Sequence, residues 1–280
     1  MTSIKEKGVI TKTALAMPLG VSRSSLYYVS KQEPKDWALK QRIETILREH
    51  PGYGSRRLSK ALPAGKDRVQ RVMRKYGIKS YRRRGTKWRK KKTIPIIYPN
   101  LLAETMPLHR HHIWAADFTE LWFKGKIVYV ATTIDLYTRE IVGAAISLRK
   151  GTALVTQALW NALLSHPHPT IFHSDNGTEY AAKSFIQLLS QCSIKISRSH
   201  PGCPWENGYQ ESFYGKFKVE FGDPNRFSSL GELVAEIYAA IWKYNHTRIH
   251  SAFNMPPASF IKKMALEPSF HSLKPIRLGV

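Results

Sequence analysis

The chain has 280 residues, of which 44 are Lys or Arg and 20 are Asp or Glu, so its formal net charge is +24. Hydrophobic residues make up 42% of it and include seven Trp, thirteen Tyr and eleven Phe, which is enough to build a core and excludes a disordered chain. The length favours two domains, and the charge favours a polyanionic partner. A ribosomal or other soluble basic protein would have a similar composition, so the motifs must decide.

Cysteine usage and hydropathy narrow the class further. Cys192 and Cys203 are too few for a disulfide framework and lack a second cysteine pair for a zinc site. No apolar segment of signal-peptide length follows the N-terminus, and nowhere do about 18 apolar residues run together. We therefore expect a soluble protein of the cytoplasm, associated with the nucleoid.

Residues 1–92 form the first predicted region, a helical one that binds DNA. Thr11 to Tyr28 contains two short helical segments separated by Pro18-Leu19-Gly20, which is the outline of a helix-turn-helix. A helical hairpin that only packs against its neighbours would have the same pattern, and both interpretations stay open.

A second helix-turn-helix is predicted further along the same region. Asp36, Ser55 and Asp67 precede helical segments at positions where they would act as N-caps. In the last of these segments, we expect a buried stripe formed by Val69, Val72, Met73 and Tyr76. The outward side would carry the basic residues Arg68, Arg71, Arg74 and Lys75. These four are candidate DNA contacts, although a solvated basic face is the alternative.

Residues 82–92 form a basic arm, RRRGTKWRKKK, in which charge repulsion opposes folding. Its basic residues would neutralise DNA phosphates and add salt-sensitive affinity; they are Arg82, Arg83, Arg84, Lys87, Arg89, Lys90, Lys91 and Lys92. The proline-containing segment 93–108 that follows is predicted to be an extended linker.

The hydrophobic period changes at residue 109, where a second domain is predicted to extend to residue 265, with a tail at 266–280. Three strand-like runs occur at 112–123, 126–135 and 139–148, followed by alternating helical and strand-like segments. This order predicts an α/β fold with a mixed sheet. Helices are expected at about 153–165, 182–191, 206–221 and 230–245, with short strands at about 169–175 and 193–199.

Three carboxylates in this domain are candidate metal ligands. Asp117 lies inside the first strand, Asp175 ends a later strand, and Glu211 lies on a helix. On that helix, Asn207, Glu211, Tyr214 and Lys218 share one predicted polar stripe. Carboxylates without sulfur ligands suit Mg²⁺ or Mn²⁺, and two such ions can support phosphoryl transfer. Lys218 and Asn207 are candidate DNA contacts near them. A zinc site at His109, His111 and His112 is disfavoured because paired cysteines are absent from the sequence.

The spacing and the surrounding motifs resemble a known family. Thirty-five residues separate Asp175 from Glu211, as in the acidic triad of retroviral-integrase-like transposases, and Lys218 follows where that family carries a basic residue. The segments HPGYGSRRL at 50–58, SDNGTEY at 174–180, ENGYQESFYGKFKVE at 206–220 and YNHTRIHSAF at 244–253 resemble the OrfB-type transposases of the bacterial insertion-sequence-three family. Ile249 and Glu206 depart from the family pattern, which usually has Pro and Asp at these places.

The resemblance implies an RNase H-like core, a mixed five-stranded sheet with flanking helices. It implies that Asp117, Asp175 and Glu211 bind Mg²⁺ or Mn²⁺, as two ions, and catalyse DNA cleavage and strand transfer at the element's terminal inverted repeats. The implied partners are double-stranded terminal-repeat and target DNA and further copies of the chain assembled on DNA. Where the chain is the catalytic half of a fusion, the product of an upstream reading frame is a further implied partner.

Three interpretations of function remain open at this point. The first is a DNA transposase. The second is a non-catalytic DNA-binding regulator of transposition, or a catalytic half that needs the upstream frame. The third is an RNase H-like nuclease, which would share the carboxylates but would need neither the helix pairs nor the basic arm.

Overall fold

The computed structural model describes residues 32–81, 98–200 and 203–266, with a few isolated positions between 16 and 25. Most of the first predicted helix-turn-helix and the whole basic arm at 82–92 lie outside the described residues. None of the described helices is both long and apolar enough to cross a membrane.

Three helices form the described N-terminal region: α2 (Gln32–Glu49), α3 (Ser55–Ala61) and α4 (Lys66–Lys75). Their shared core consists of Leu39, Ile43, Tyr53, Leu58, Val69, Val72 and Met73, with Tyr76 partly buried beside it. The apolar stripe predicted for α4 is therefore confirmed.

The predicted caps of these helices are wrong. The N-caps of α3 and α4 are Gly54 and Gly65, which lie in extended conformations and have no side chain to cap with. Asp36 lies inside α2 and is fully buried. A sequence cannot distinguish a capping Asp from a buried Asp one turn further on, because both precede the apolar stripe.

The second domain is built on a five-stranded sheet of β1 (Ile113–Phe123), β2 (Lys126–Asp135), β3 (Ile141–Ser147), β4 (Ile171–Ser174) and β5 (Lys195–Arg198). The strand order is β3-β2-β1-β4-β5. The first three strands are antiparallel, and β4 and β5 are parallel to β1 and to each other. This mixed α/β sheet is RNase H-like, as predicted.

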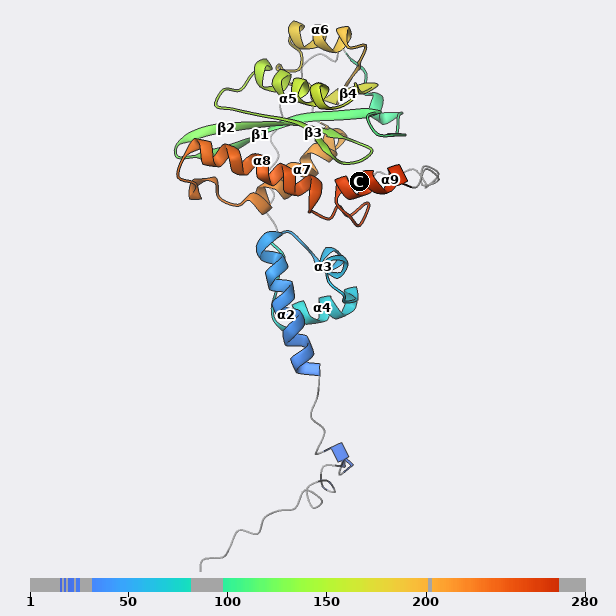
Figure 1. The fold of residues 1–280 in the computed structure, drawn as a ribbon, viewed down its shortest axis with the longest axis vertical. Helices are drawn as coiled ribbons and strands as arrows, with labels where there is room; N and C mark the ends of the chain where they lie inside the picture. The colour runs from blue at the N-terminus through green and yellow to red at the C-terminus, as the bar shows by residue number, and fades with distance from the viewer. Residues whose placement is uncertain are drawn as a thin grey trace, which may run out of the picture.

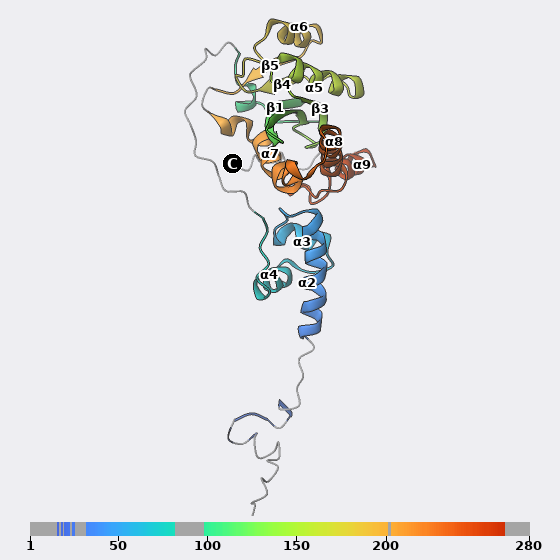
Figure 2. The ribbon, with the colours of Figure 1, turned by 90° about the vertical axis from the view of Figure 1, so that its left-hand side faces the viewer.

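Helices cover both faces of the sheet (Figures 1 and 2). One face packs against α5 (Thr152–Ser165) and α6 (Lys183–Gln191), and the other against α7 (Gly208–Phe221) and α8 (Leu230–His246). Alternation along β1 assigns Trp114 and Ala116 to the first face and Ile113 and Ala115 to the second. The α7 side of the sheet is therefore the side on which odd-numbered β1 residues lie.

The chain after α8 contacts the N-terminal helices and then forms α9 (Pro257–Leu266), a helix that was not predicted. The backbone N–H of Ile249 donates to the hydroxyl of Tyr53 at 2.7 Å, and the Ile249 side chain packs on the core of α2–α4. Arg248 pairs with Glu220 of α7 at 2.8 Å. These contacts join the N-terminal helices to the α7 side of the second domain, where both views place them (Figures 1 and 2).

Candidate active site

Strand register places Asp117 and Asp175 beside each other. In the parallel β1–β4 pair, Ala115 is the partner of His173, and each aspartate follows two residues later. Neighbouring strands lie about 4.8 Å apart, and residues two apart share a face. Both aspartates are half-buried. Alternation places Asp117 on the α7 side of the sheet, and Asp175 lies one residue beyond the end of β4. The pairing therefore sets Asp117 beside the end of the strand that Asp175 follows.

Local hydrogen bonds and charges show the environment of the two acids. Asp117 Oδ1 accepts from the Phe118 N–H at 2.8 Å, and Asp175 Oδ1 accepts from the Gly177 N–H at 2.9 Å. The buried hydroxyl of Tyr180 has its pKa raised well above the ordinary value, first by burial and then by the negative charges of Asp117 and Asp175. Both carboxylates thus act on one buried tyrosine.

The turn after β4 brings a further carboxylate to Asp175. A β-carbon added at Gly177 would lie 2.8 Å from Asp175 Oδ1 and 2.9 Å from Glu179 Oε2, so a side chain there would displace these two carboxylates. Glu179 is buried and pairs with Lys150 at 3.2 Å. Sequence reasoning missed Glu179 and Lys150, although Glu179 lies within the quoted SDNGTEY segment.

Gln210 holds helix α7 against β1 at the level of the aspartates. Its amide nitrogen donates to the carbonyls of Ala115 at 2.7 Å and Thr132 at 3.1 Å, and its oxygen accepts from the Thr132 hydroxyl at 3.1 Å. Gln210 is fully buried. Glu211 follows it in the chain and is exposed. Sequence reasoning missed Gln210, because a glutamine in a polar helix is usually on the surface.

The polar stripe predicted along α7 is wrong in part. Tyr214 is buried, and its hydroxyl donates to the Asp117 carbonyl at 2.7 Å. Asn207 is also buried and donates to the Ala116 carbonyl at 3.3 Å. Lys218 is half-buried, which leaves Glu211 as the exposed member of the four. The physical reason is that these polar groups satisfy the backbone of β1 and are not solvated.

His173 connects strand β4 to strand β5 through a hydrogen bond. It is fully buried, and its Nδ1 lies 2.9 Å from the Ser197 hydroxyl of β5, which in turn accepts from the Leu101 N–H at 2.9 Å. Burial is the main cause that lowers the pKa of His173 to about 4. The neutral imidazole therefore links β4, β5 and the segment that enters the domain.

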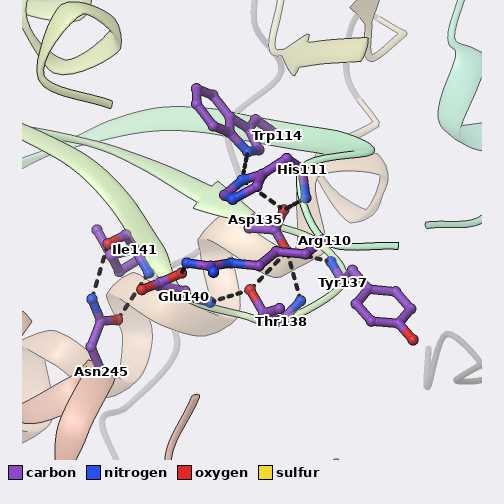
Figure 3. A network of polar contacts seen from close by, with 9 residues as sticks. All are labelled: Arg110, His111, Trp114, Asp135, Tyr137, Thr138, Glu140, Ile141 and Asn245. Carbon is purple, nitrogen blue, oxygen red and sulfur yellow. Dashed lines mark hydrogen bonds and ion pairs between the residues drawn. The ribbon is translucent and has the colours of Figure 1, made fainter. Parts of the chain in front are cut away.

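A second carboxylate network, at the start of β1, is structural. Asp135 is fully buried and accepts from the backbone N–H groups of His111, Tyr137 and Thr138 and from the Thr138 hydroxyl, at 2.6 to 3.1 Å (Figure 3). Burial is the largest influence on Asp135 and raises its pKa, although these hydrogen bonds oppose the shift. Asp135 closes the β2–β3 turn, as its position between two strands predicts.

The candidate DNA contacts on α4 divide into two pairs. All four are exposed, and they differ in whether they pair with Asp36. Arg71 makes two hydrogen bonds to buried Asp36, at 2.6 and 2.7 Å, and lowers the pKa of that carboxyl to about 2. Lys75 lies 3.6 Å from Asp36 as well. Arg71 and Lys75 are thus engaged in holding α4 to α2.

The donor chemistry at Asp117 and Asp175 fits a hard divalent cation, because both ligands are carboxylates side by side at one edge. Glu211 is not gathered with them: within the described residues, no group of three or more His, Cys, Asp and Glu side chains is placed to hold a metal ion. Strand pairing sets Asp117 beside the end of β4, where Asp175 follows. Glu211 lies on α7, next to Gln210.

Comparison with known proteins identifies the family. Two family models, each described as an integrase core domain, match residues 107–204 and 192–257. An uncharacterized 31 kDa protein of insertion element IS600 from Shigella sonnei is 34% identical over 87% of this chain and 96% of its own length. The transposase of insertion sequence element IS904 from Lactococcus lactis is 30% identical over 80% of this chain and 93% of its own.

A further relative and one solved structure are also similar to this chain. The putative transposase InsK of IS150 from Escherichia coli K12 is 32% identical over 82% of this chain and 85% of its own length. A solved HTLV-2 integrase catalytic core domain in complex with magnesium is 17% identical, with a TM-score of 0.46 over 58% of this chain and 97% of that one. The motifs, the sheet order and the full-length relatives lead to one conclusion: the chain belongs to the OrfB-type transposases of the insertion-sequence-three family, which carry an integrase core domain.

Proposed function

We propose that this protein is the transposase of a bacterial insertion sequence, which cleaves DNA at the element's terminal inverted repeats and joins the ends to target DNA. The observation that carries the proposal is the β1–β4 register, which sets Asp117 beside the end of β4, where Asp175 follows, while Gln210 holds helix α7 to β1. In a member of the integrase-core family, that arrangement supports polynucleotidyl transfer.

Asp117, Asp175 and Glu211 are the proposed catalytic residues and would hold Mg²⁺ or Mn²⁺, as two ions. When bound, the metal would supply activation of the attacking oxygen and stabilisation of the leaving oxygen at phosphorus. Glu211 lies on the exposed side of α7, so we infer that its carboxylate turns toward the aspartates when the site is loaded. Gln210 and Tyr214 contribute by fixing the backbone of α7 and β1.

Proposed contacts to double-stranded DNA come from three places. Lys218 lies on α7, Arg68 and Arg74 are exposed on α4, and the basic arm 82–92 follows α4. Asn207 is buried against β1 and is not retained as a DNA contact. Arg71 and Lys75 would contact DNA only with the parts of their side chains that Asp36 leaves accessible. We also propose that further copies assemble on DNA, because two element ends must be joined in one reaction, and that an upstream frame supplies any missing end recognition.

The test is strand transfer by the purified full chain on a labelled duplex carrying the terminal repeat, with Mg²⁺. Wild-type protein should give joined products, and Asp175→Ala should give none. Glu120→Ala is the matched control, since Glu120 is an exposed acid on the same strand as Asp117 and should retain joining.

Binding without cutting or joining by the wild type would contradict a self-sufficient transposase. Adding the product of the upstream reading frame then separates the two remaining cases. Restored joining would identify the chain as the catalytic half of a longer enzyme, whereas continued inactivity would identify a regulator.

A further inference from the structure

Five basic side chains gather where the N-terminal helices, α7 and the segment after α8 meet. They are Arg57 of α3, Arg139 of the β2–β3 turn, Lys216 of α7, and Arg248 and His250 after α8, called here the basic cluster. Arg139 is 4% exposed and Arg248 is 2% exposed. Arg57, Lys216 and His250 are half-buried and form the part of the cluster that reaches solvent.

Ring contacts and hydrogen bonds place these groups around two shared supports. The guanidinium groups of Arg57 and Arg248 lie 5.8 and 6.0 Å from the centre of the Tyr53 ring. The guanidinium group of Arg139 lies 3.9 Å from the centre of the Tyr209 ring. Tyr209 is on α7, two helical turns before Lys216. The cluster is thus held between Tyr53 and the Tyr209–Lys216 side of α7.

The positive charges act on one another. Burial and the charges of Arg139, Lys216, Arg248 and Arg57 lower the pKa of His250 to about 3. Burial, followed by Arg248 and Arg57, lowers the pKa of Lys216 to about 8. Burial is the larger cause of both shifts, and the neighbouring positive charges add to it; a bound anion would oppose this second contribution.

The carboxylate that the structure provides for the cluster is Glu220, and it is already engaged. Both of its oxygens accept from Arg248 Nε, at 2.8 and 2.9 Å. Five buried donor atoms around the cluster have no hydrogen-bond partner among the described residues: Arg57 Nε, Arg139 Nη1, Arg248 Nη1 and Nη2, and Tyr209 Oη. Buried polar groups are normally paired, so these donors indicate a ligand with several acceptor oxygens.

Guanidinium donors match the oxygens of a phosphate group in charge and geometry. A cavity of about 530 Å³ adjoins the cluster and shares Arg57 with it; Arg56, Arg74 and Ser251, whose hydroxyl accepts from Arg57, also line it. Its basic walls offer an approach for a polyanion from the α3–α4 side. The side chains that would surround the ligand come from α3, the β2–β3 turn, α7 and the segment after α8.

We propose that the basic cluster is a phosphate-binding site, which takes a backbone phosphate of the DNA and fixes the N-terminal helices against the second domain. This inference rests on the proposed function for the source of the phosphate. The cluster contains none of the three carboxylates and joins side chains of both regions, so its role is to couple DNA binding to the placement of the two regions.

The experiment uses the full chain and two probes, inorganic phosphate and a terminal-repeat duplex. Lys216→Met removes one charge of the cluster and keeps the stem, and the variant should fold because it relieves like-charge repulsion. Lys126→Met is the control, since Lys126 is an exposed lysine at the start of β2. At constant ionic strength, phosphate in place of chloride should raise the Tm of wild type and Lys126→Met, and should raise that of Lys216→Met much less.

The DNA arm measures the dependence of the binding constant on salt. Loss of one phosphate contact should reduce the slope of log K against log salt by about 0.9 in Lys216→Met relative to Lys126→Met. An absent Tm shift in the wild type overturns the site. A Tm shift with equal slopes in the two variants overturns the DNA part and identifies a site for free phosphate. Strand transfer is measured on the same samples to distinguish this proposal from the proposed function. If the wild type joins DNA ends but shows neither the Tm shift nor the difference in salt slope, only the phosphate site is rejected.

Discussion

Asp135 and Asp175 both lie beside strand β1, and the fold uses them in opposite ways. Asp135 is fully buried and accepts hydrogen bonds from three backbone N–H groups and a hydroxyl. Asp175 is half-buried, and its carboxylate accepts from the N–H of Gly177. A carboxylate has about four acceptor positions, so four donors commit Asp135 to structure. The difference teaches that accessibility and remaining acceptor capacity, and not residue type, separate a catalytic candidate from a structural acid.

The largest effect should come from the accessible acid. Asp175→Asn keeps the shape of the side chain but removes a charged ligand, so strand transfer should fall by a factor of about a thousand or more. The urea unfolding midpoint should stay close to that of the wild type. A folded Asp175→Asn protein that still joins DNA ends at the wild-type rate would remove Asp175 from the chemistry.

Asp135→Ala should show the reverse pattern. It leaves four buried donors without their acceptor, which costs about 3 kcal/mol or more of unfolding free energy. Asp67→Ala is the matched control, because Asp67 is exposed and caps nothing; its change should be within about 0.5 kcal/mol. Urea denaturation of the two variants measures both. Equal stability of Asp135→Ala and the wild type would contradict the structural role.

Protonation of buried His173 should make the free energy of unfolding fall as the pH is lowered. The pKa of buried His173 lies at about 4, below the ordinary 6.5. As pH falls, the unfolded chain takes up this proton first, so the contribution is complete above about pH 6.5 and is lost as pH falls to about 4. It amounts to about 3 kcal/mol at most. Urea midpoints measured across this window should decline.

A control separates His173 from two other histidines whose pKa values are also lowered, His111 to about 4 and His250 to about 3. His173→Gln keeps a polar group near Ser197 but does not titrate. Its decline in midpoint between about pH 6.5 and about pH 4 should be shallower than that of the wild type. Parallel declines in the two proteins would place the titration elsewhere.

The smallest expected effect concerns the clamp on α7. Gln210→Met keeps the volume but removes the hydrogen bonds to Ala115 and Thr132, which costs about 2 kcal/mol. Strand transfer should fall as well, because we propose that this contact positions Glu211. Gln187→Met on the exposed side of α6 should change neither. A loss of stability with full activity would show that the clamp supports the fold and does not position Glu211.

The sheet was predictable because its strands show β-branched and aromatic runs separated by turns. The catalytic role of the three acids stays a prediction, which rests on their spacing matching a family pattern. The helix caps were not predictable from side-chain types, because Gly54 and Gly65 act through their backbone conformation. Gln210 and Asp36 were missed for another reason. Each is a polar residue whose burial depends on a partner far away in the chain, the β1 backbone in one case and Arg71 in the other.

The contact between Ile249 and Tyr53 has a consequence for preparing fragments of this protein. A recombinant catalytic fragment that begins in the 93–108 linker would lack Tyr53 and Leu58, which cover Ile249. The freed apolar side chain and its unpaired backbone N–H would then face solvent and favour self-association. Solubility of such a truncation should improve with Ile249→Lys, or with a start at residue 32 that retains the helices.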